Sequence, residues 1–226
     1  KHLATKSKAS MILIQDQKRQ HLYSKVGVNS QDQLVSLPKL QTQNPSQHGI
    51  FTGIHILSTE VFEHLENKPC GINDTLYPFF MKNSPESVHG FVDTTGFWYD
   101  TGDLPAFLAT TQALLKEIEL KNPFIHDIFS MLDLKLKEVV SGVWATGDLG
   151  AENIQFSTPC LIGKGVQFGK NVEIGAYSVI GDGSVIGDSV SIHNSVLLPN
   201  SKVAAGSTLK NVIQYETISL STKSIA

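Results

Sequence analysis

The sequence has little cysteine, with only Cys70 and Cys160 among 226 residues. Two cysteines far apart give neither a disulfide framework nor the closely spaced ligand pairs of a zinc site. We expect both to be buried thiols. Apolar runs long enough to span a membrane are also lacking, and the first ten residues are polar rather than a signal core. The expected location is therefore cytoplasmic, with no membrane partner.

An excess of one charge is lacking too, since 18 Lys and Arg against 21 Asp and Glu give a formal net charge of -3. Without a basic cluster, the sequence lacks the electrostatic footprint of a nucleic-acid-binding protein. The hydrophobic content of 41% is that of a folded chain, which excludes general disorder. The histidines show no metal-ligand spacing. Small molecules and further copies of the chain are the expected partners.

A repeat is the strongest feature that the sequence does have. Apolar residues recur every six positions, at Phe156, Ile162, Phe168, Ile174, Ile180, Ile186, Ile192 and Leu198. Five of them are followed directly by glycine. A spacing of six does not fit the 3.6-residue stripe of an α-helix. It predicts a solenoid with one short strand and one tight turn per repeat, and with the aliphatic side chain inside.

The stretch IGKGVQFGKNVEIGAYSVIGDGSVIGDS resembles the hexapeptide-repeat family of left-handed parallel β-helices. Counted to Leu209, the repeat makes about three coils, and so short a stack exposes apolar ends. We therefore expect capping by the preceding domain or by another subunit, and a homo-oligomer.

Two functions for this β-helix stay open at this point. One is a structural or oligomerising element. The other is a hexapeptide acyltransferase, in which a histidine acts as general base. His193 stands in the repeat, directly after Ile192, but no inserted loop accompanies it. We interpret His193 as a residue that packs at a corner.

Upstream of the repeat, strand and helix patterns alternate, which is typical of an α/β domain. Strands are predicted over 10–15, 25–29, 34–37 and 49–57, and two short strands across a turn at 94–96. The residues 29–33 are the predicted turn between the second and third strands.

Three helices are also predicted. Ser58 is expected to cap the first, whose apolar face holds Val61, Phe62 and Leu65. Asp103 is expected to cap the second, with a proline in its first turn. The third spans 124–140 with an apolar stripe and bridges the two domains.

Three stretches in the N-terminal part carry a second resemblance: FTGIHILSTEVFEHL, INDTLYPFFMKN and VHGFVDTTGFWYDTGDLPAFLATTQALL. In order and spacing they resemble the closing half of the catalytic domain of sugar-1-phosphate nucleotidyltransferases, such as mannose-1-phosphate guanylyltransferases. Many members carry a β-helix directly afterwards. The resemblance implies an α/β chain in three parts. They are the C-terminal half of a Rossmann-like nucleotidyltransferase domain over 1–116, a helical linker over 117–152 and a left-handed β-helix over 153–226.

The resemblance also implies a reaction: a nucleoside triphosphate and a sugar 1-phosphate give an NDP-sugar and pyrophosphate, with magnesium (Mg2+) neutralising charge. GTP and mannose 1-phosphate are the expected pair. The run Trp98 to Gly102 matches the family's W-x-D-x-G stretch, which makes Asp100 the implied catalytic metal ligand. Without the resemblance, Asp100 is a turn aspartate. Gly53 matches a position where the backbone approaches the sugar, and Thr52 and Asn73 are candidates to bind its hydroxyls.

Two departures from the family are visible. Its glycine-rich phosphate loop and its first metal aspartate are not in the sequence, and we expect both to lie before Lys1. Many members also have a Glu-Lys-Pro whose lysine reaches the sugar phosphate, where this chain has Ser36-Leu37-Pro38. Lys39 is the candidate substitute. If nothing substitutes for that lysine, we expect the full-length protein to be a weak enzyme or a non-catalytic regulatory homologue.

Overall fold

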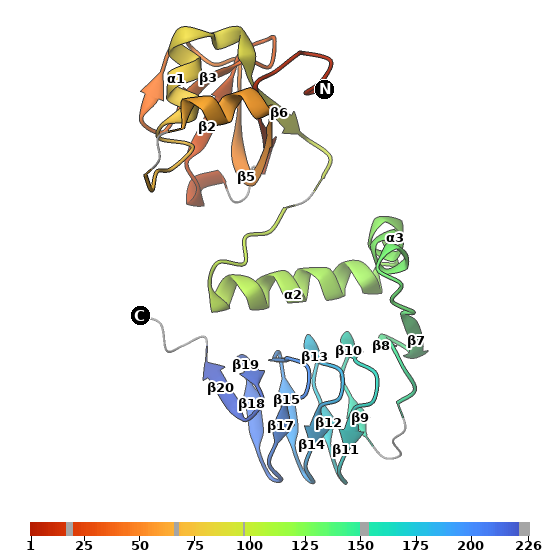
Figure 1. Ribbon diagram of the computed structural model, residues 1–226. Coiled ribbons are helices and arrows are strands. Elements are labelled where there is room, and N and C mark those ends of the chain that lie inside the picture. Colours follow the sequence, from red (N-terminus) through yellow and green to blue (C-terminus); the bar gives the residue numbers. More distant parts are fainter. Residues whose placement is uncertain (17–19, 66–67, 97, 150–153, 222–226) are drawn as a thin grey trace. The chain divides into compact units, whose positions relative to one another are not determined.

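The computed structural model describes residues 1–16, 20–65, 68–96, 98–149 and 154–221, and only the backbone of His126. The chain divides into two compact units, Lys1–Trp98 and Tyr99–Ala226, which we call unit 1 and unit 2. The helices and strands of each unit carry the labels shown in Figure 1.

Unit 1 is built on a six-stranded sheet with the order β4-β3-β2-β5-β1-β6. Its strands are β1 (Ala9–Ile14), β2 (Lys25–Val28), β3 (Leu34–Leu37), β4 (Leu40–Gln41), β5 (Gln47–Leu57) and β6 (Val88–Asp93). The strands predicted over 10–15, 25–29, 34–37 and 49–57 are thereby confirmed. β1 and β6 run parallel, whereas the other neighbouring pairs are antiparallel. This mostly antiparallel sheet does not show the Rossmann-like arrangement that the resemblance implied.

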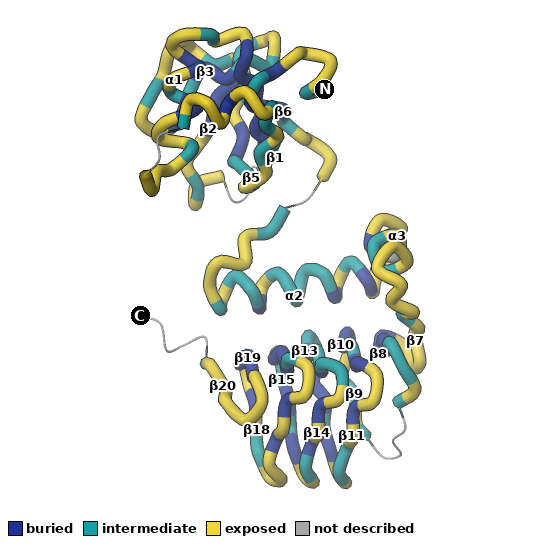
Figure 2. The backbone as a smooth tube through the Cα atoms, in the orientation of Figure 1, coloured by how far each residue is buried: buried dark blue, intermediate teal, exposed yellow. Residues whose placement is uncertain are grey.

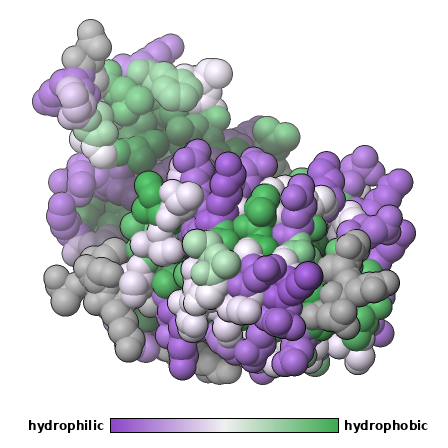
Figure 3. Space-filling model, turned by 90° about the horizontal axis from the view of Figure 1, so that it is seen from below, coloured by the Kyte–Doolittle hydropathy of each residue, from purple (hydrophilic) through white to green (hydrophobic). Residues whose placement is uncertain are grey.

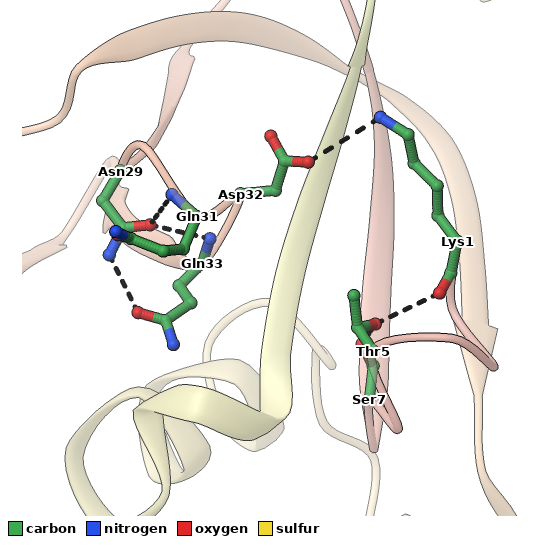
Figure 4. Close-up of polar contacts among 7 residues, drawn as sticks. All are labelled: Lys1, Thr5, Ser7, Asn29, Gln31, Asp32 and Gln33. Carbon is green, nitrogen blue, oxygen red and sulfur yellow. Dashed lines mark hydrogen bonds and ion pairs between the residues drawn. The ribbon is translucent and has the colours of Figure 1, made fainter.

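The turn between β2 and β3 is held by Asn29, as Figure 4 shows. Its Oδ1 accepts hydrogen bonds from the backbone N–H groups of Gln31 (3.0 Å) and Gln33 (2.9 Å). Asp32, in the same turn, lies 3.7 Å from the ammonium of Lys1. The predicted turn over 29–33 is confirmed, and the Asn29 side chain adds to its backbone hydrogen bonds, as Asn commonly does in turns.

One face of this sheet is covered by α1 (Leu76–Asn83). Tyr77 and Phe80 of α1 are almost wholly buried and pack with Met11 and Leu13 of β1 in one apolar cluster. Burying each such side chain contributes about 1.5–3 kcal/mol. Three short 3-10 segments complete unit 1: η1 (Gln20–Leu22), η2 (Thr59–His64) and η3 (Pro85–Ser87).

The helix predicted after Ser58 is the 3-10 segment η2 rather than an α-helix. Ser58 makes no capping bond, and within the described part of the chain its Oγ has no hydrogen-bond partner. Val61 is buried, but Phe62 is 57% exposed. Because a 3-10 helix has three residues per turn, it does not align the apolar positions that an α-helix would bring to one face.

The two strands predicted across a turn at 94–96 are also wrong in part, since only β6 forms. The carboxylate of Asp93 accepts from the backbone N–H groups of Thr95 (2.9 Å) and Gly96 (3.1 Å), which ends the strand. Trp98 then donates from Nε1 to the Thr52 carbonyl at 3.0 Å. The chain after the turn is thus attached to β5 through a side chain, and its residues 98–102 form no strand.

Unit 2 contains a parallel β-solenoid of about four turns. Strands of successive coils pair with one another and form three sheets. The sheet orders are β20-β19-β16-β13-β10-β8-β7, β11-β14-β17 and β18-β15-β12-β9. The strands are β7 (Lys137–Val140), β8 (Val143–Ala145), β9 (Gln155–Phe156), β10 (Cys160–Ile162), β11 (Gln167–Phe168), β12 (Glu173–Ile174), β13 (Ser178–Ile180), β14 (Val185–Ile186), β15 (Ser191–His193), β16 (Val196–Leu197), β17 (Lys202–Val203), β18 (Thr208–Lys210), β19 (Val212–Tyr215) and β20 (Ile218–Ser221). The terminal strands β7 and β20 pair antiparallel with their neighbours.

The interior of the solenoid agrees with the repeat, and Figure 2 shows buried segments along its coils with exposed turns between them. The five isoleucines predicted to lie inside, Ile162, Ile174, Ile180, Ile186 and Ile192, are each at most 2% exposed. The prediction for Leu198 is wrong. Ile180 pairs with Leu197, which is buried, while Leu198 is only partly buried and packs toward a helix. One residue fewer in the turn after Ile192 shifts the register of the last coil.

A helix, α2 (Leu104–Glu119), lies along the seven-stranded sheet (Figure 1). Asp103 caps it as predicted, with Oδ1 accepting from the Ala106 N–H at 2.7 Å. Leu108 of α2 packs against Val196 and Ile213 of the solenoid. These contacts form a hydrophobic cluster of their own, separate from the interior core of the solenoid.

The helix predicted over 124–140 is much shorter, because α3 (Pro123–Met131) ends near Asp133, which has φ of 52°. The residues after it form β7, which pairs with β8 across a hairpin at Gly142. The β-branched pair in KEVV favours this strand over a helix. Phe124 and Leu132 of the predicted stripe are exposed.

Hydrophilic and hydrophobic side chains are interleaved on the face that Figure 3 shows. Among the helices that the structure describes, none is long and apolar enough to cross a membrane.

Candidate functional site

A pocket of about 430 Å³ opens in unit 1, and we call it the α1 pocket. It is lined from β1, β2, β5, the β3–β4 hairpin and the region of α1. Its apolar lining includes Met11, Val26, Leu37, Leu40, Phe51 and the two prolines Pro38 and Pro78, and its polar lining is Ser24, Lys39, Asn73, Asp74 and Lys82. The volume lies in the range of small-molecule sites.

Two of the predicted substrate-binding residues, Lys39 and Asn73, line this pocket together. Lys39 extends from the β3–β4 hairpin, and Asn73 precedes α1. The Lys39 ammonium lies 3.0 Å from Oδ1 of Asp74, and both side chains are more than half exposed. An ion pair with this exposure contributes about 1 kcal/mol or less. Lys39 can therefore leave Asp74 for a stronger anion at little cost.

Lys82 is the second cation of the α1 pocket, in the last turn of α1. Its side chain is exposed and makes no ion pair or hydrogen bond with any residue in the described ranges. A cation in a last helical turn also favours the helix dipole. With Lys39 and Asp74 balancing each other, Lys82 leaves the pocket with one net positive charge. Neither Lys82 nor Asp74 was predicted from the sequence, because no motif links them to the hairpin.

Thr52 and Gly53 lie on β5, next to Phe51 of the pocket, but they do not line it. The Thr52 hydroxyl donates to the Ile12 carbonyl at 2.8 Å, so that its proton is already used. Gly53 has φ of 87°, and the position of a Cβ there would meet no atom within 4 Å. Glycine is thus needed for the left-handed backbone rather than for close packing.

Asp100 belongs to unit 2 and is exposed. Its Oδ1 accepts from the Gly102 N–H at 2.9 Å, which is the geometry of a turn aspartate. Within the described residues, no group of three or more His, Cys, Asp or Glu could hold a metal ion. Magnesium often takes only one or two protein carboxylates and completes its shell with phosphate and water. Asp100 fits one such ligand, and its role stays a prediction.

At Ser36-Leu37-Pro38, where the sequence departs from the family, the structure places the middle residue in the core. Leu37 ends β3 and is only 7% exposed. It joins the apolar cluster that includes Met11 and Val26. A lysine at this position would have to leave the core or bury its charge, which is costly. Along the hairpin, Lys39 is the cation that reaches the pocket instead.

The pocket wall at Phe51 is supported by a partly buried polar pair, His55 and Tyr77, that the sequence did not reveal. The hydroxyl of Tyr77 donates to the Ser10 carbonyl at 3.1 Å, and Nδ1 of His55 lies 2.9 Å from the same hydroxyl oxygen. The His55 ring contacts the Phe51 ring, with centroids 4.7 Å apart. Burial raises the pKa of Tyr77 and lowers the pKa of His55. Both groups are therefore neutral at pH 7 and serve to fix the wall.

On the solenoid, His193 lies on the outer surface, with its ring against Gly175 of the preceding coil. Its Nε2 lies 2.8 Å from the Ser191 hydroxyl and 3.7 Å from a carboxylate oxygen of Glu173. A Cβ at position 175 would clash with the ring, so the glycine provides room for it. This contact agrees with the packing interpretation of His193.

The expectation for the cysteines is half confirmed. Cys160 is buried in β10, and burial raises the pKa of its thiol to about 12. Cys70 is exposed, so the prediction of a buried thiol is wrong there. It lies in a surface loop before α1, where the neighbouring residues Lys68 and Gly71 are exposed too.

The described residues thus form a sheet unit that is mostly antiparallel and has a pocket, followed by a parallel β-solenoid. Residues 156–221, which make up most of the solenoid, match the family model described as the GMPPB C-terminal domain. This match confirms the resemblance of the solenoid to the β-helix of the sugar-1-phosphate nucleotidyltransferase family.

Two curated proteins are also similar to this chain in sequence. The chain is 33% identical over 92 residues to mannose-1-phosphate guanyltransferase 2 of Candida glabrata, a match covering 41% of this chain and 24% of that protein. It is 29% identical over 97 residues to mannose-1-phosphate guanyltransferase of Gibberella zeae, covering 39% of this chain and 26% of that protein. The matched region spans about a quarter of the length of these relatives.

Proposed function

We propose that the full-length protein transfers a nucleotidyl group from a nucleoside triphosphate to a sugar 1-phosphate, giving an NDP-sugar and pyrophosphate. GTP and mannose 1-phosphate are the proposed pair. The match of residues 156–221 to the GMPPB C-terminal domain carries the proposal. The two mannose-1-phosphate guanyltransferases similar to this chain support the choice of substrates.

In this proposal the α1 pocket binds the sugar phosphate. Lys39 exchanges its exposed partner Asp74 for the phosphate, and Asn73 hydrogen-bonds a sugar hydroxyl. Thr52 and Gly53 position the neighbouring strand, since the Thr52 hydroxyl is already bonded to the Ile12 carbonyl. Asp100 provides one carboxylate ligand for magnesium. Bound magnesium neutralises phosphate charge as the α-phosphorus is attacked.

A non-catalytic regulatory homologue is the second candidate, and Leu37 favours it. Where many family members have a lysine, Leu37 is buried in an apolar cluster. The one cation nearby on the hairpin, Lys39, already has a carboxylate partner. If Lys39 does not leave Asp74, no cation of the hairpin reaches the sugar phosphate.

Pyrophosphate release by the full-length protein separates these candidates. The assay uses magnesium with a panel of nucleoside triphosphates and sugar 1-phosphates. Turnover with any pair supports the enzyme, and the preferred pair identifies the base and the sugar. No turnover with any pair, from protein that melts cooperatively, excludes the enzyme and supports the regulatory homologue.

We also infer that the chain self-associates through the ends of the solenoid. The terminal strands carry exposed apolar side chains, Val139 and Val140 on β7 and Ile218 and Leu220 on β20. Both strands are edges of the seven-stranded sheet. Edge strands of this kind pair readily with another chain.

A further inference from the structure

The ion pair between Lys39 and Asp74 joins two separate segments that line the α1 pocket. Lys39 lies in the two-residue turn of the β3–β4 hairpin, because Leu37 pairs with Leu40. β4 is the outermost strand on its side of the six-stranded sheet. The Lys39 side chain is 82% exposed. It can therefore change direction without disturbing the core.

The backbone of Asp74, by contrast, is fixed in a turn before α1. Its N–H donates to the Gly71 carbonyl at 3.0 Å. The same carbonyl accepts from the N–H (3.1 Å) and the hydroxyl (2.9 Å) of Thr75. The Asp74 carboxylate is thus held close to the pocket whether or not Lys39 contacts it. An anion that approaches Lys39 meets a negative charge already in place.

Lys82 supplies a cation that Asp74 does not neutralise. It lines the same pocket from the last turn of α1 and forms no ion pair with any residue in the described ranges. Since a lysine ammonium stands on a flexible four-carbon stem, Lys39 and Lys82 can both turn toward one ligand in a pocket of about 430 Å³. A phosphate monoester carries nearly two negative charges at pH 7, because its second pKa is about 6. Two lysines match this charge, whereas one does not.

We propose that Lys82 is a second phosphate-binding residue of the α1 pocket, and that Asp74 competes with the phosphate for Lys39. The ligand is the sugar phosphate of the proposed function, on which this inference rests. The empty pocket then keeps one net positive charge, at Lys82. A bound sugar phosphate is held less tightly than the two lysines alone would hold it, which keeps the substrate from being trapped in a stable complex.

The test is calorimetric titration of the full-length protein with mannose 1-phosphate and with glucose 1-phosphate, without nucleotide. Asp74→Asn keeps the shape of the side chain and removes its charge, and it should tighten binding about three- to fivefold. Damage to the fold would weaken binding, so a structural effect does not explain such a gain. Asp127→Asn removes an exposed carboxylate from α3 of unit 2 and should leave the affinity unchanged.

Two further variants test the lysines. Lys82→Gln should weaken binding about fivefold, because one of the two cations is lost. Lys116→Gln removes an exposed lysine from α2 of unit 2 and should not weaken it. In a Lys39→Gln background, Asp74→Asn should lose most of its gain, since no Lys39 remains to be released.

Three results with the variants would overturn the proposal: no gain from Asp74→Asn, an equal gain with and without Lys39, or no loss from Lys82→Gln. Failure of both sugar phosphates to bind the parent protein would overturn it as well. Binding with the expected effects but without pyrophosphate release would exclude the enzyme and leave the inference standing. Pyrophosphate release without these effects would do the reverse.

Discussion

The solenoid and unit 1 build their cores by different rules. In the solenoid, each coil repeats the same strands and turns, so that buried isoleucines stack on their counterparts in the next coil, as Ile162 does on Ile180 and Ile174 on Ile192. In unit 1, the core combines residues of separate strands with Tyr77 and Phe80 of α1, at no fixed spacing. The α1 pocket lies in the irregular unit. A repeat thus allows the core to be predicted from the sequence, whereas the α1 pocket forms where strands, a hairpin and a helix meet.

The largest expected effect is a loss of stability caused by a charge in the interior of the solenoid. Ile180→Asp places an unpaired carboxylate among the buried isoleucines and should lower the free energy of unfolding by about 4 kcal/mol or abolish folding of the solenoid. Val185→Asp is the control, because Val185 is 39% exposed on a neighbouring strand. Thermal and urea unfolding measure both. Equal melting of the Ile180→Asp variant and the parent would refute the inward assignment.

The next effect concerns chemistry rather than stability. In the full-length protein, Asp100→Asn should reduce pyrophosphate release by about a hundredfold, near 3 kcal/mol, because one negative metal ligand is lost. Asp103→Asn is the control, since asparagine caps a helix about as well as aspartate. If Asp100 only shapes its turn, asparagine serves there as well. Near-parental turnover of the Asp100→Asn variant would then remove Asp100 from the site.

Substitutions at the ends of the solenoid should weaken self-association, whereas a substitution in its middle should not. At tens of micromolar we expect light scattering to give a mass above that of the monomer. Val140→Lys on β7 or Ile218→Lys on β20 should weaken the assembly at least tenfold, about 1.4 kcal/mol. Val185→Lys, on a strand paired on both sides, should not. A clean monomer of the parent protein would contradict the inference.

A smaller effect tests the support of the pocket wall in unit 1. Tyr77→Phe removes the hydroxyl that donates to the Ser10 carbonyl and should cost about 1 kcal/mol of unfolding free energy. Tyr215→Phe is the matched control in unit 2, where Tyr215 is 54% exposed. Urea unfolding compares the two. A cost equal to that of the control would show that the buried hydrogen bond contributes nothing net.

The smallest effect is a dependence on pH. Burial lowers the pKa values of His55 and His89, so the unfolded chain takes up protons more readily than the folded one. Stability is then present above pH 6.5, the ordinary pKa of histidine, and decreases as the pH falls below it. Urea unfolding at pH 7.5 and 5.5 measures the decrease, which should be smaller for His89→Asn. A difference of the same size in that variant would exclude a contribution from His89.

Local patterns predicted much of the backbone. The strands of unit 1 follow from alternating and β-branched runs, and the helix cap at Asp103 follows from its place before a proline and an apolar stripe. The wrong predictions share a cause, which is that tertiary contacts decided the outcome. The helix predicted over 124–140 lost its second half to β7, because pairing with β8 outweighed a helical stripe. Phe62 and Cys70 proved exposed, since the composition of a short segment does not say which side meets the core.

By itself the sequence determined the solenoid interior and the helix cap, because period and capping act between residues close along the chain. Only the tertiary structure decided that Leu197 rather than Leu198 enters the core, since one turn residue shifts the register. It alone also brought Lys39 and Lys82 to one pocket, from a hairpin and from the end of a helix. Contacts between residues so far apart depend on how strands and helix pack, and no local pattern encodes that packing.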